Sequence, residues 1–141
     1  MADFNSVQFA KQIADPNLGV HVNEWGGRVR AYWFEYTSLG TEADTETIAL
    51  VRLPKGARLL DGLLVHGAHT GADLLIGTEA DPDRYLTTAD IALDGTVEFL
   101  RTAANFFGEV LTETTDVIAT VDTATLTVGE ILNGYILAVV D

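Results

Sequence analysis

Apolar and polar residues alternate along much of the chain after residue 27, and this period of two constrains the fold most. The clearest example is Asp116–Asp122, in which Val117, Ala119 and Val121 share one side of an extended chain. Strands with one buried face give this pattern, whereas helices repeat every 3.6 residues. No helical pattern of ten or more residues interrupts the series, so the body of the protein is expected to be all-β.

Eight runs of this kind, bounded by Gly, Pro or Asp, are predicted to be strands. They are Arg28–Thr37, Thr47–Leu53, Ala57–Val65, Asp73–Thr78, Thr96–Arg101, Asn105–Thr112, Asp116–Asp122 and Leu132–Val140. Two further segments, Thr87–Gly95 and Thr125–Ile131, fit a short strand, a helical turn or an ordered loop. Eight antiparallel strands favour a two-sheet antiparallel β-sandwich, with a jelly roll as the preferred topology.

The first 27 residues differ from the rest, so we predict an N-terminal arm over residues 1–27 and a β-sandwich domain over residues 28–141. The apolar residues of the arm follow neither period, although a short helix capped by Ser6 fits Ser6–Ala14. Two interpretations stay open: a terminus folded onto its own sandwich, or an extended arm that lies on a neighbouring subunit or on a partner. The large apolar candidates for such a contact are Phe4, Phe9, Ile13 and Trp25.

The charge balance argues against several classes of partner. Eight Lys and Arg residues against 21 Asp and Glu give a net charge of −13, which disfavours nucleic-acid binding. The absence of cysteine removes disulfides and thiolate chemistry. No apolar run approaches the roughly 18 residues of a membrane span, and the first residues do not resemble a signal peptide. We therefore expect a soluble protein made in the cytoplasm.

Three of the eight basic residues, Arg52, Lys55 and Arg58, lie within seven positions. The sequence Leu53–Gly56 fits a type I turn, with Pro at its second position and Gly at its fourth, joining two strands as in a hairpin. The structural interpretation is that the basic side chains stay in water and protect strand ends from edge pairing. The functional interpretation is a contact with an acidic partner surface.

The histidines and serines give little support for catalysis or transition-metal binding. His66 and His69 have a His-x-x-His spacing without a third ligand, and solvated loop histidines are the expected interpretation. Neither Ser6 nor Ser38 lies in a Gly-x-Ser-x-Gly motif. We predict no enzyme activity and no cofactor.

The acidic segment Thr78–Ile91 is the other candidate for a metal site. Asp81 and Asp83, with Glu79 or Asp73 nearby, could offer oxygens to calcium, but the spacing is not that of an EF-hand. A turn in which Asp81 caps the backbone and Arg84 pairs with a carboxylate explains the same residues. No metal site is predicted.

Three segments carry a family resemblance. They are Thr47–Gly62 (TIALVRLPKGARLLDG), Leu74–Leu86 (LLIGTEADPDRYL) and Gly134–Asp141 (GYILAVVD). This pattern, within Arg28–Asp141, resembles the decoration or cement proteins of tailed bacteriophages, which are small proteins encoded near the major capsid protein. The first 27 residues lie outside the resemblance.

The resemblance implies a structural virion protein with a β-sandwich core. It would bind the major capsid protein on the outer surface of the phage head as a homotrimer or another small oligomer, and would stabilise the capsid. The aromatic residues of Arg28–Thr37 also favour a homo-oligomer, since they offer more apolar area than one small core covers easily. An alternative is a phage fibre or carbohydrate-binding module that presents Trp25, Trp33 or Tyr85 to a sugar.

Overall fold

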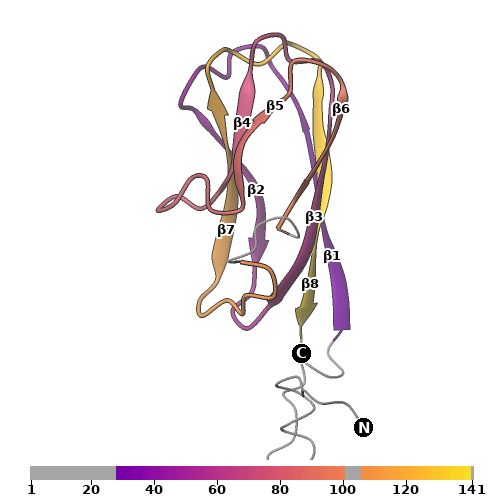
Figure 1. The fold of residues 1–141 in the computed structure, drawn as a ribbon, viewed down its shortest axis with the longest axis vertical. Helices are drawn as coiled ribbons and strands as arrows, with labels where there is room; N and C mark the ends of the chain where they lie inside the picture. The colour runs from indigo at the N-terminus through magenta and orange to yellow at the C-terminus, as the bar shows by residue number, and fades with distance from the viewer. Residues whose placement is uncertain (1–27, 101–105, 141) are drawn as a thin grey trace, which may run out of the picture.

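The structure, a computed structural model, describes residues 28–100 and 106–140, and these residues form eight β-strands (Figure 1). The strands are β1 (Arg28–Thr37), β2 (Thr47–Leu53), β3 (Arg58–His66), β4 (Asp73–Gly77), β5 (Leu86–Asp90), β6 (Gly95–Phe99), β7 (Thr115–Asp122) and β8 (Ile131–Val140). The described ranges contain no helix, and so none that is long and apolar enough to cross a membrane.

The strands form two antiparallel sheets, with the orders β1-β8-β3-β6 and β2-β7-β4-β5. The pairing is nested: β1 pairs with β8, β2 with β7, β3 with β6 and β4 with β5. A long hairpin that is rolled up into two layers produces this arrangement. The predicted two-sheet sandwich is therefore confirmed, and the strand order is consistent with the expected jelly roll.

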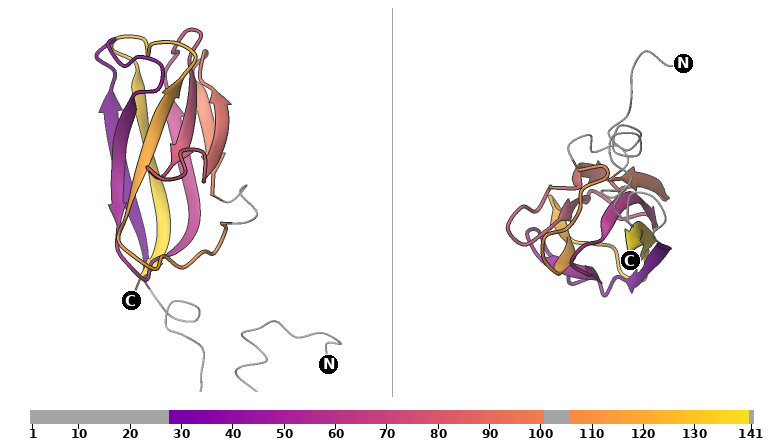
Figure 2. Two further views of the ribbon diagram at one scale, coloured as in Figure 1. Left: turned by 90° about the vertical axis from the view of Figure 1, so that its left-hand side faces the viewer. Right: turned by 90° about the horizontal axis from the view of Figure 1, so that it is seen from below.

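All eight strands run along the long axis of the molecule, as the views of Figures 1 and 2 show. Because Arg28 is opposite Val140 in the β1·β8 pair, the first and last strands begin and end at one end of the sandwich. We call this the basal end, and it also holds the β2–β3 turn. The opposite, distal end holds the β1–β2, β3–β4, β5–β6 and β7–β8 loops (Figure 1).

The core lies between the two sheets and follows the predicted alternation. Val117, Ala119 and Val121 of β7 are completely buried, whereas Ile118 and Thr120 between them are only partly covered. The largest buried side chains include Leu53, Leu59, Leu64, Leu74, Ile76, Phe99, Leu132 and Ile136, which come from both sheets. Close packing of these inner faces fixes the sandwich.

One predicted strand is wrong, and one open segment proves to be a strand. The described part of Asn105–Thr112 forms a turn at Phe106–Gly108, where Gly108 has a φ of +77°, and then an isolated bridge between Val110 and Arg58. The eighth strand is instead β5, which begins at Leu86 and otherwise lies in the undecided segment Thr87–Gly95. The other undecided segment, up to Glu130, is a loop that precedes β8.

Candidate interaction surfaces

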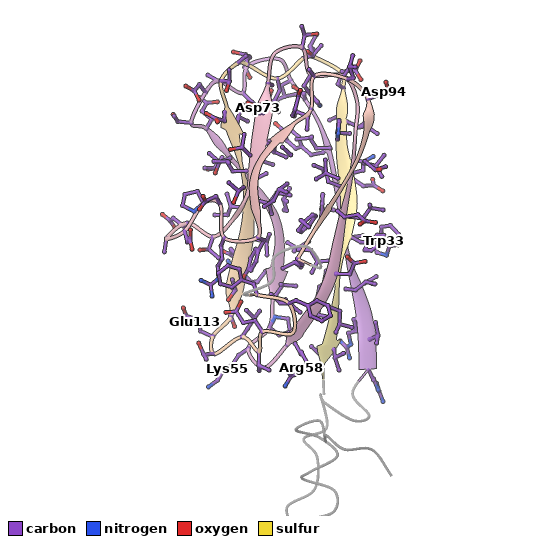
Figure 3. All side chains as sticks on the ribbon, in the orientation of Figure 1. Trp33, Lys55, Arg58, Asp73, Asp94 and Glu113 are labelled. Carbon is purple, nitrogen blue, oxygen red and sulfur yellow. The ribbon has the colours of Figure 1, made fainter. Side chains whose placement is uncertain are left out.

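Basic residues gather at the basal end of the sandwich. Arg28 of β1 is opposite Val140 of β8, and Arg58 of β3 is opposite the preceding residue of β8, Val139. Lys55 lies on the turn between β2 and β3. Figure 3 shows Lys55 and Arg58 side by side at this end. A shallow pocket of about 230 Å³ separates the turn from β1. Its lining consists of Arg30, Tyr32, Pro54, Lys55, Gly56 and Val140.

The basic end, which we define as Arg28, Arg30, Arg52, Lys55 and Arg58, thus contains two residues that sequence reasoning did not include. Arg28 and Arg30 join the predicted group only through the β1·β8·β3 pairing. The Arg-Val-Arg sequence at the start of the first predicted strand showed a second cluster of basic residues. Its position beside Lys55 depends on the order of strands in the sheet, which local sequence patterns do not determine.

The turn at the basic end differs from the one predicted. The amide of Ala57 donates to the carbonyl of Pro54 at 3.3 Å, and Gly56 in the third position has a φ of +88°. A positive φ there is typical of a type II turn, so the turn begins one residue later than expected and is not type I. It also connects strands of different sheets, so it is a corner and not a hairpin.

The three predicted basic residues are held to different degrees. Arg52 forms a bidentate ion pair with Asp116 on β7, with Nε–Oδ1 and Nη2–Oδ2 distances of 2.7 and 3.1 Å. The hydrogen bond from Arg52 lowers the pKa of the Asp116 carboxyl. Arg58 donates to the carbonyl oxygen of Gly108 at 2.7 Å. Lys55 is exposed at the corner.

Acidic residues dominate the distal end. Asp73 and Asp94 are there in Figure 3, and the register places Asp90 and Asp122 on either side of Asp73. Three more carboxylates, those of Asp44, Glu46 and Glu130, belong to the loops at this end. Glu113 is an acid near the basal end, but the part of that end formed by β1 and the β2–β3 turn is basic. The charge of the sandwich is therefore divided along its long axis.

One distal carboxylate, Glu42, is buried and organises its loop. It accepts hydrogen bonds from the hydroxyls of Tyr36 (2.5 Å) and Ser38 (2.7 Å) and from the amides of Leu39 (2.8 Å) and Gly40 (3.1 Å). Burial alone would raise the pKa of Glu42, but these hydrogen bonds, first that of Tyr36, lower it to about 2. The same bond raises the pKa of Tyr36 to about 12. Both oxygens of Glu42 thus accept hydrogen bonds that connect the end of β1 to the following loop.

The two described histidines have structural roles, and the expectation that they are solvated loop residues is wrong. His69 is completely buried and His66 nearly so. The amide of Thr127 donates to Nδ1 of His69 at 3.2 Å, so Nε2 carries the proton and donates to the Ile131 carbonyl at 3.2 Å. His69 thus ties the β3–β4 loop to the β7–β8 loop. His21 lies outside the described residues.

The acidic Thr78–Tyr85 loop is organised by Arg84. This side chain pairs with Glu109 at 2.5 Å and with Asp81 at 3.8 Å, and its guanidinium carbon lies 4.2 Å from the ring centre of Phe106. The predicted pairing of Arg84 with a carboxylate is confirmed, although the backbone carbonyl of Asp81, and not its side chain, closes the turn.

A polar groove of about 470 Å³ lies between this loop and residues 109–116. Within residues 28–100 and 106–140, no three His, Asp or Glu side chains form a group that could hold a metal ion, so the calcium alternative finds no support there. Arg84 and Arg52 form ion pairs with three of the acids that line the groove, namely Asp81, Glu109 and Asp116.

The four candidate arm residues, Phe4, Phe9, Ile13 and Trp25, lie outside the described residues. Arg28, the first described residue, belongs to the basic end, so the chain enters the sandwich at that end. Of the aromatic residues considered for sugar binding, Trp33 is 70% exposed on β1, while Tyr85 is 2% exposed and cannot offer its ring to a ligand. Trp25 belongs to the undescribed arm.

Comparison with known proteins identifies the fold. No family model and no curated protein matches the sequence. Among solved structures, a chain of the cyanophage Pam1 capsid asymmetric unit is similar with a TM-score of 0.70 and 18% identity, over the full length of both chains. A chain of the Ralstonia phage GP4 capsid gives 0.66 and 19%, covering 82% of this chain and 86% of its own.

A third similar chain belongs to the capsid of the Helicobacter pylori bacteriophage KHP30, with a TM-score of 0.57 and 17% identity. The match covers 79% of this chain and 87% of that one. At these identities the similarity concerns the fold. The eight-stranded sandwich is therefore a fold that chains from three phage capsids share.

Proposed function

We propose that this protein is a structural virion protein, a decoration or cement protein that binds the major capsid protein on the outside of a phage head and stabilises the shell. The observation that supports this most is the match to a chain of the Pam1 capsid over 100% of both chains.

The division of charge supports attachment through the basal end. Lys55 and Arg30 line a shallow basic pocket there, and a positive surface on a protein of net charge −13 favours an acidic partner surface. The arm joins the sandwich at Arg28, so the candidate nearest in sequence, Trp25, would act beside the same surface. The arm and the basic end together form the proposed capsid contact.

The proposal also includes the oligomeric state and the place of action. The protein is made in the host cytoplasm, binds as a homotrimer and acts on the outer capsid surface without a cofactor and without enzyme activity. The acidic distal end then faces solvent, where it keeps neighbouring particles apart.

Reconstitution tests this function. Heads assembled without the protein are mixed with the purified chain and reconstructed by electron cryomicroscopy. We expect additional density at symmetric positions on the outer surface and a higher temperature of DNA release than for bare heads. Bare heads that show no ordered density at saturating protein would overturn the proposal.

Binding of a glycan, as in a phage fibre or carbohydrate-binding module, is the second candidate function. Its support is the exposed Trp33, whose ring packs edge-on against Tyr135 with 5.3 Å between ring centres. Quenching of tryptophan fluorescence by a glycan, and its loss in Trp33→Phe, would favour this alternative over decoration.

A further inference from the structure

The outer side of the β1-β8-β3-β6 sheet carries an exposed apolar surface. Trp33 of β1 is opposite Tyr135 of β8, which is opposite Leu63 of β3, so these three side chains form a row across the sheet. We define the lateral face as this row and its exposed or half-buried apolar neighbours. It consists of Val29, Ala31, Trp33, Leu63, Val65, Tyr135 and Leu137.

Exposure of the lateral face is largest at its β1 side. Trp33 is 70% exposed and Val29 is 60% exposed, which is high for residues of their size in a strand. Figure 3 shows Trp33 projecting from the side of the sandwich, about midway between its two ends. The edge-on contact with Tyr135, at an interplanar angle of 69°, holds the Trp33 ring in place. A large aromatic ring that is already ordered loses little entropy when a partner covers it.

The charge of the lateral face distinguishes it from the rest of the surface. Among the outward residues of β1 and β8, five on each strand, Glu35 alone is charged. The outward residues of the other sheet include Asp73, Asp116 and Asp122. Two copies of a chain with a net charge of −13 repel each other wherever their acidic surfaces meet. On the β3 and β6 side of the same sheet, Asp61 is opposite Leu137 and Glu98 is opposite Leu63. The β1 and β8 part of the lateral face is therefore where two copies can approach with the least repulsion.

We propose that the lateral face packs against the same face of other copies of this chain, around an axis parallel to the long axis of the sandwich. This inference rests on the proposed function, because attachment by the basal end leaves the long sides of the sandwich turned toward neighbouring copies. Trp33 of each copy then lies near its equivalents, and the apolar side chains of β1 and β8 lose their contact with water. A sugar is a poorer occupant, because within the lateral face only the indole N–H of Trp33 and the hydroxyl of Tyr135 could form hydrogen bonds with it.

Cross-linking tests this contact, because the chain contains no cysteine and a single introduced thiol reports one position. Ala31→Cys places the thiol on the exposed part of the lateral face, and Thr47→Cys places the control thiol on the exposed part of β2, in the other sheet. Each variant is treated with a short bis-maleimide, both free in solution and bound to heads. We expect covalent dimers from Ala31→Cys and single chains from Thr47→Cys.

A second variant tests the energetic role of Trp33. Trp33→Arg should weaken self-association in solution by about thirtyfold, the typical effect of losing an interface centre, whereas Trp33→Phe should retain most of it. Sedimentation velocity measures the association. An unchanged thermal melt shows that the sandwich is intact, as expected for a side chain exposed on the sheet surface.

The outcomes separate this inference from the proposed function. Cross-linked dimers in solution together with heads that bind no protein would support the lateral contact and contradict decoration. Fully decorated heads on which Ala31→Cys gives no dimers would support decoration and overturn the lateral contact. The lateral contact is also overturned if both cysteine variants give dimers to the same extent. It is overturned as well if neither variant gives dimers, either in solution or on heads.

Discussion

The hydroxyl of Tyr36, near the end of β1, donates a 2.5 Å hydrogen bond to Oε1 of Glu42 in the following loop. Three other donors complete the shell of this buried carboxylate. A buried carboxylate with this many donors is favourable while it is ionised, and each donor loses its partner when the group is protonated or removed.

The first prediction concerns acid stability. The folded state lowers the pKa of Glu42 from 4.5 to about 2, so its ionisation stabilises the fold above pH 4.5 and loses this effect as the pH falls toward 2. The loss over that range should be about 3 kcal/mol of unfolding free energy. Urea unfolding at a series of pH values measures it. Glu42→Gln should be less stable at pH 7 and should lack this part of the pH dependence. An equal slope in both proteins would contradict the prediction.

The second prediction concerns Gly134, in the middle of β8. A Cβ at this position would lie 2.0 Å from the carbonyl oxygen of Leu63 and 2.7 Å from the ring of Phe34. Since the first of these atoms belongs to the backbone of β3, the strands must separate to admit a methyl group. Gly134→Ala should cost about 3 kcal/mol or more, the upper part of the range for overpacking. Gly95→Ala is the control, because its Cβ would meet His66 at an ordinary 3.8 Å. Urea unfolding compares the variants, and equal midpoints would contradict the prediction.

The third prediction concerns the arm. A chain that begins at Gly27 should keep its β-type circular dichroism spectrum and cooperative melt, because the described core comes from the eight strands. It should lose most of its occupancy on heads. Trp25→Ala in the full chain should weaken binding by about tenfold to thirtyfold, the effect of losing an apolar anchor. Full decoration by the truncated chain would show that the arm belongs to the packing of its own domain.

The fourth prediction concerns the basic end. Lys55→Gln should weaken binding to heads by about fivefold at low salt, as expected for an exposed charge contact of about 1 kcal/mol, and by less at high salt. Thr125→Glu changes the net charge by the same amount but lies in a distal loop, so it should leave binding unchanged. Titration of heads at two salt concentrations measures both. Equal effects of the two variants would show that the net charge matters and the basic end does not.

Local patterns predicted most of the strands because each of those strands buries one face. β1 and β2 begin and end where the alternation placed them. β5 was left undecided because its sequence, Leu-Thr-Thr-Ala-Asp, is polar and three of its five residues are exposed. The opposite error occurred at Phe106 and Phe107, where two aromatics suggested a strand, but Phe107 is 57% exposed in a turn.

The candidate surfaces were less predictable, because they combine residues that are far apart in the sequence. Arg28 reaches the corner of Lys55 only because β8 lies between β1 and β3. The row of Trp33, Tyr135 and Leu63 likewise depends on strand register. Tyr85 was considered for sugar binding and His69 was expected to be solvated, but both are buried, which the sequence did not reveal.

The nested pairing of strands also determines when this chain can fold. β8 separates β1 from β3, so until residues 131–140 have been synthesised β1 has no neighbour in its sheet and β3 has only β6. Closing β1 onto β8 joins segments about a hundred residues apart, and such distant pairings make folding slow. During synthesis, the inner face of β1 therefore stays exposed to solvent until β8 has been made. The sandwich can be completed only after β8 has been synthesised, and until then the strong negative charge of the chain opposes aggregation of its uncovered strands.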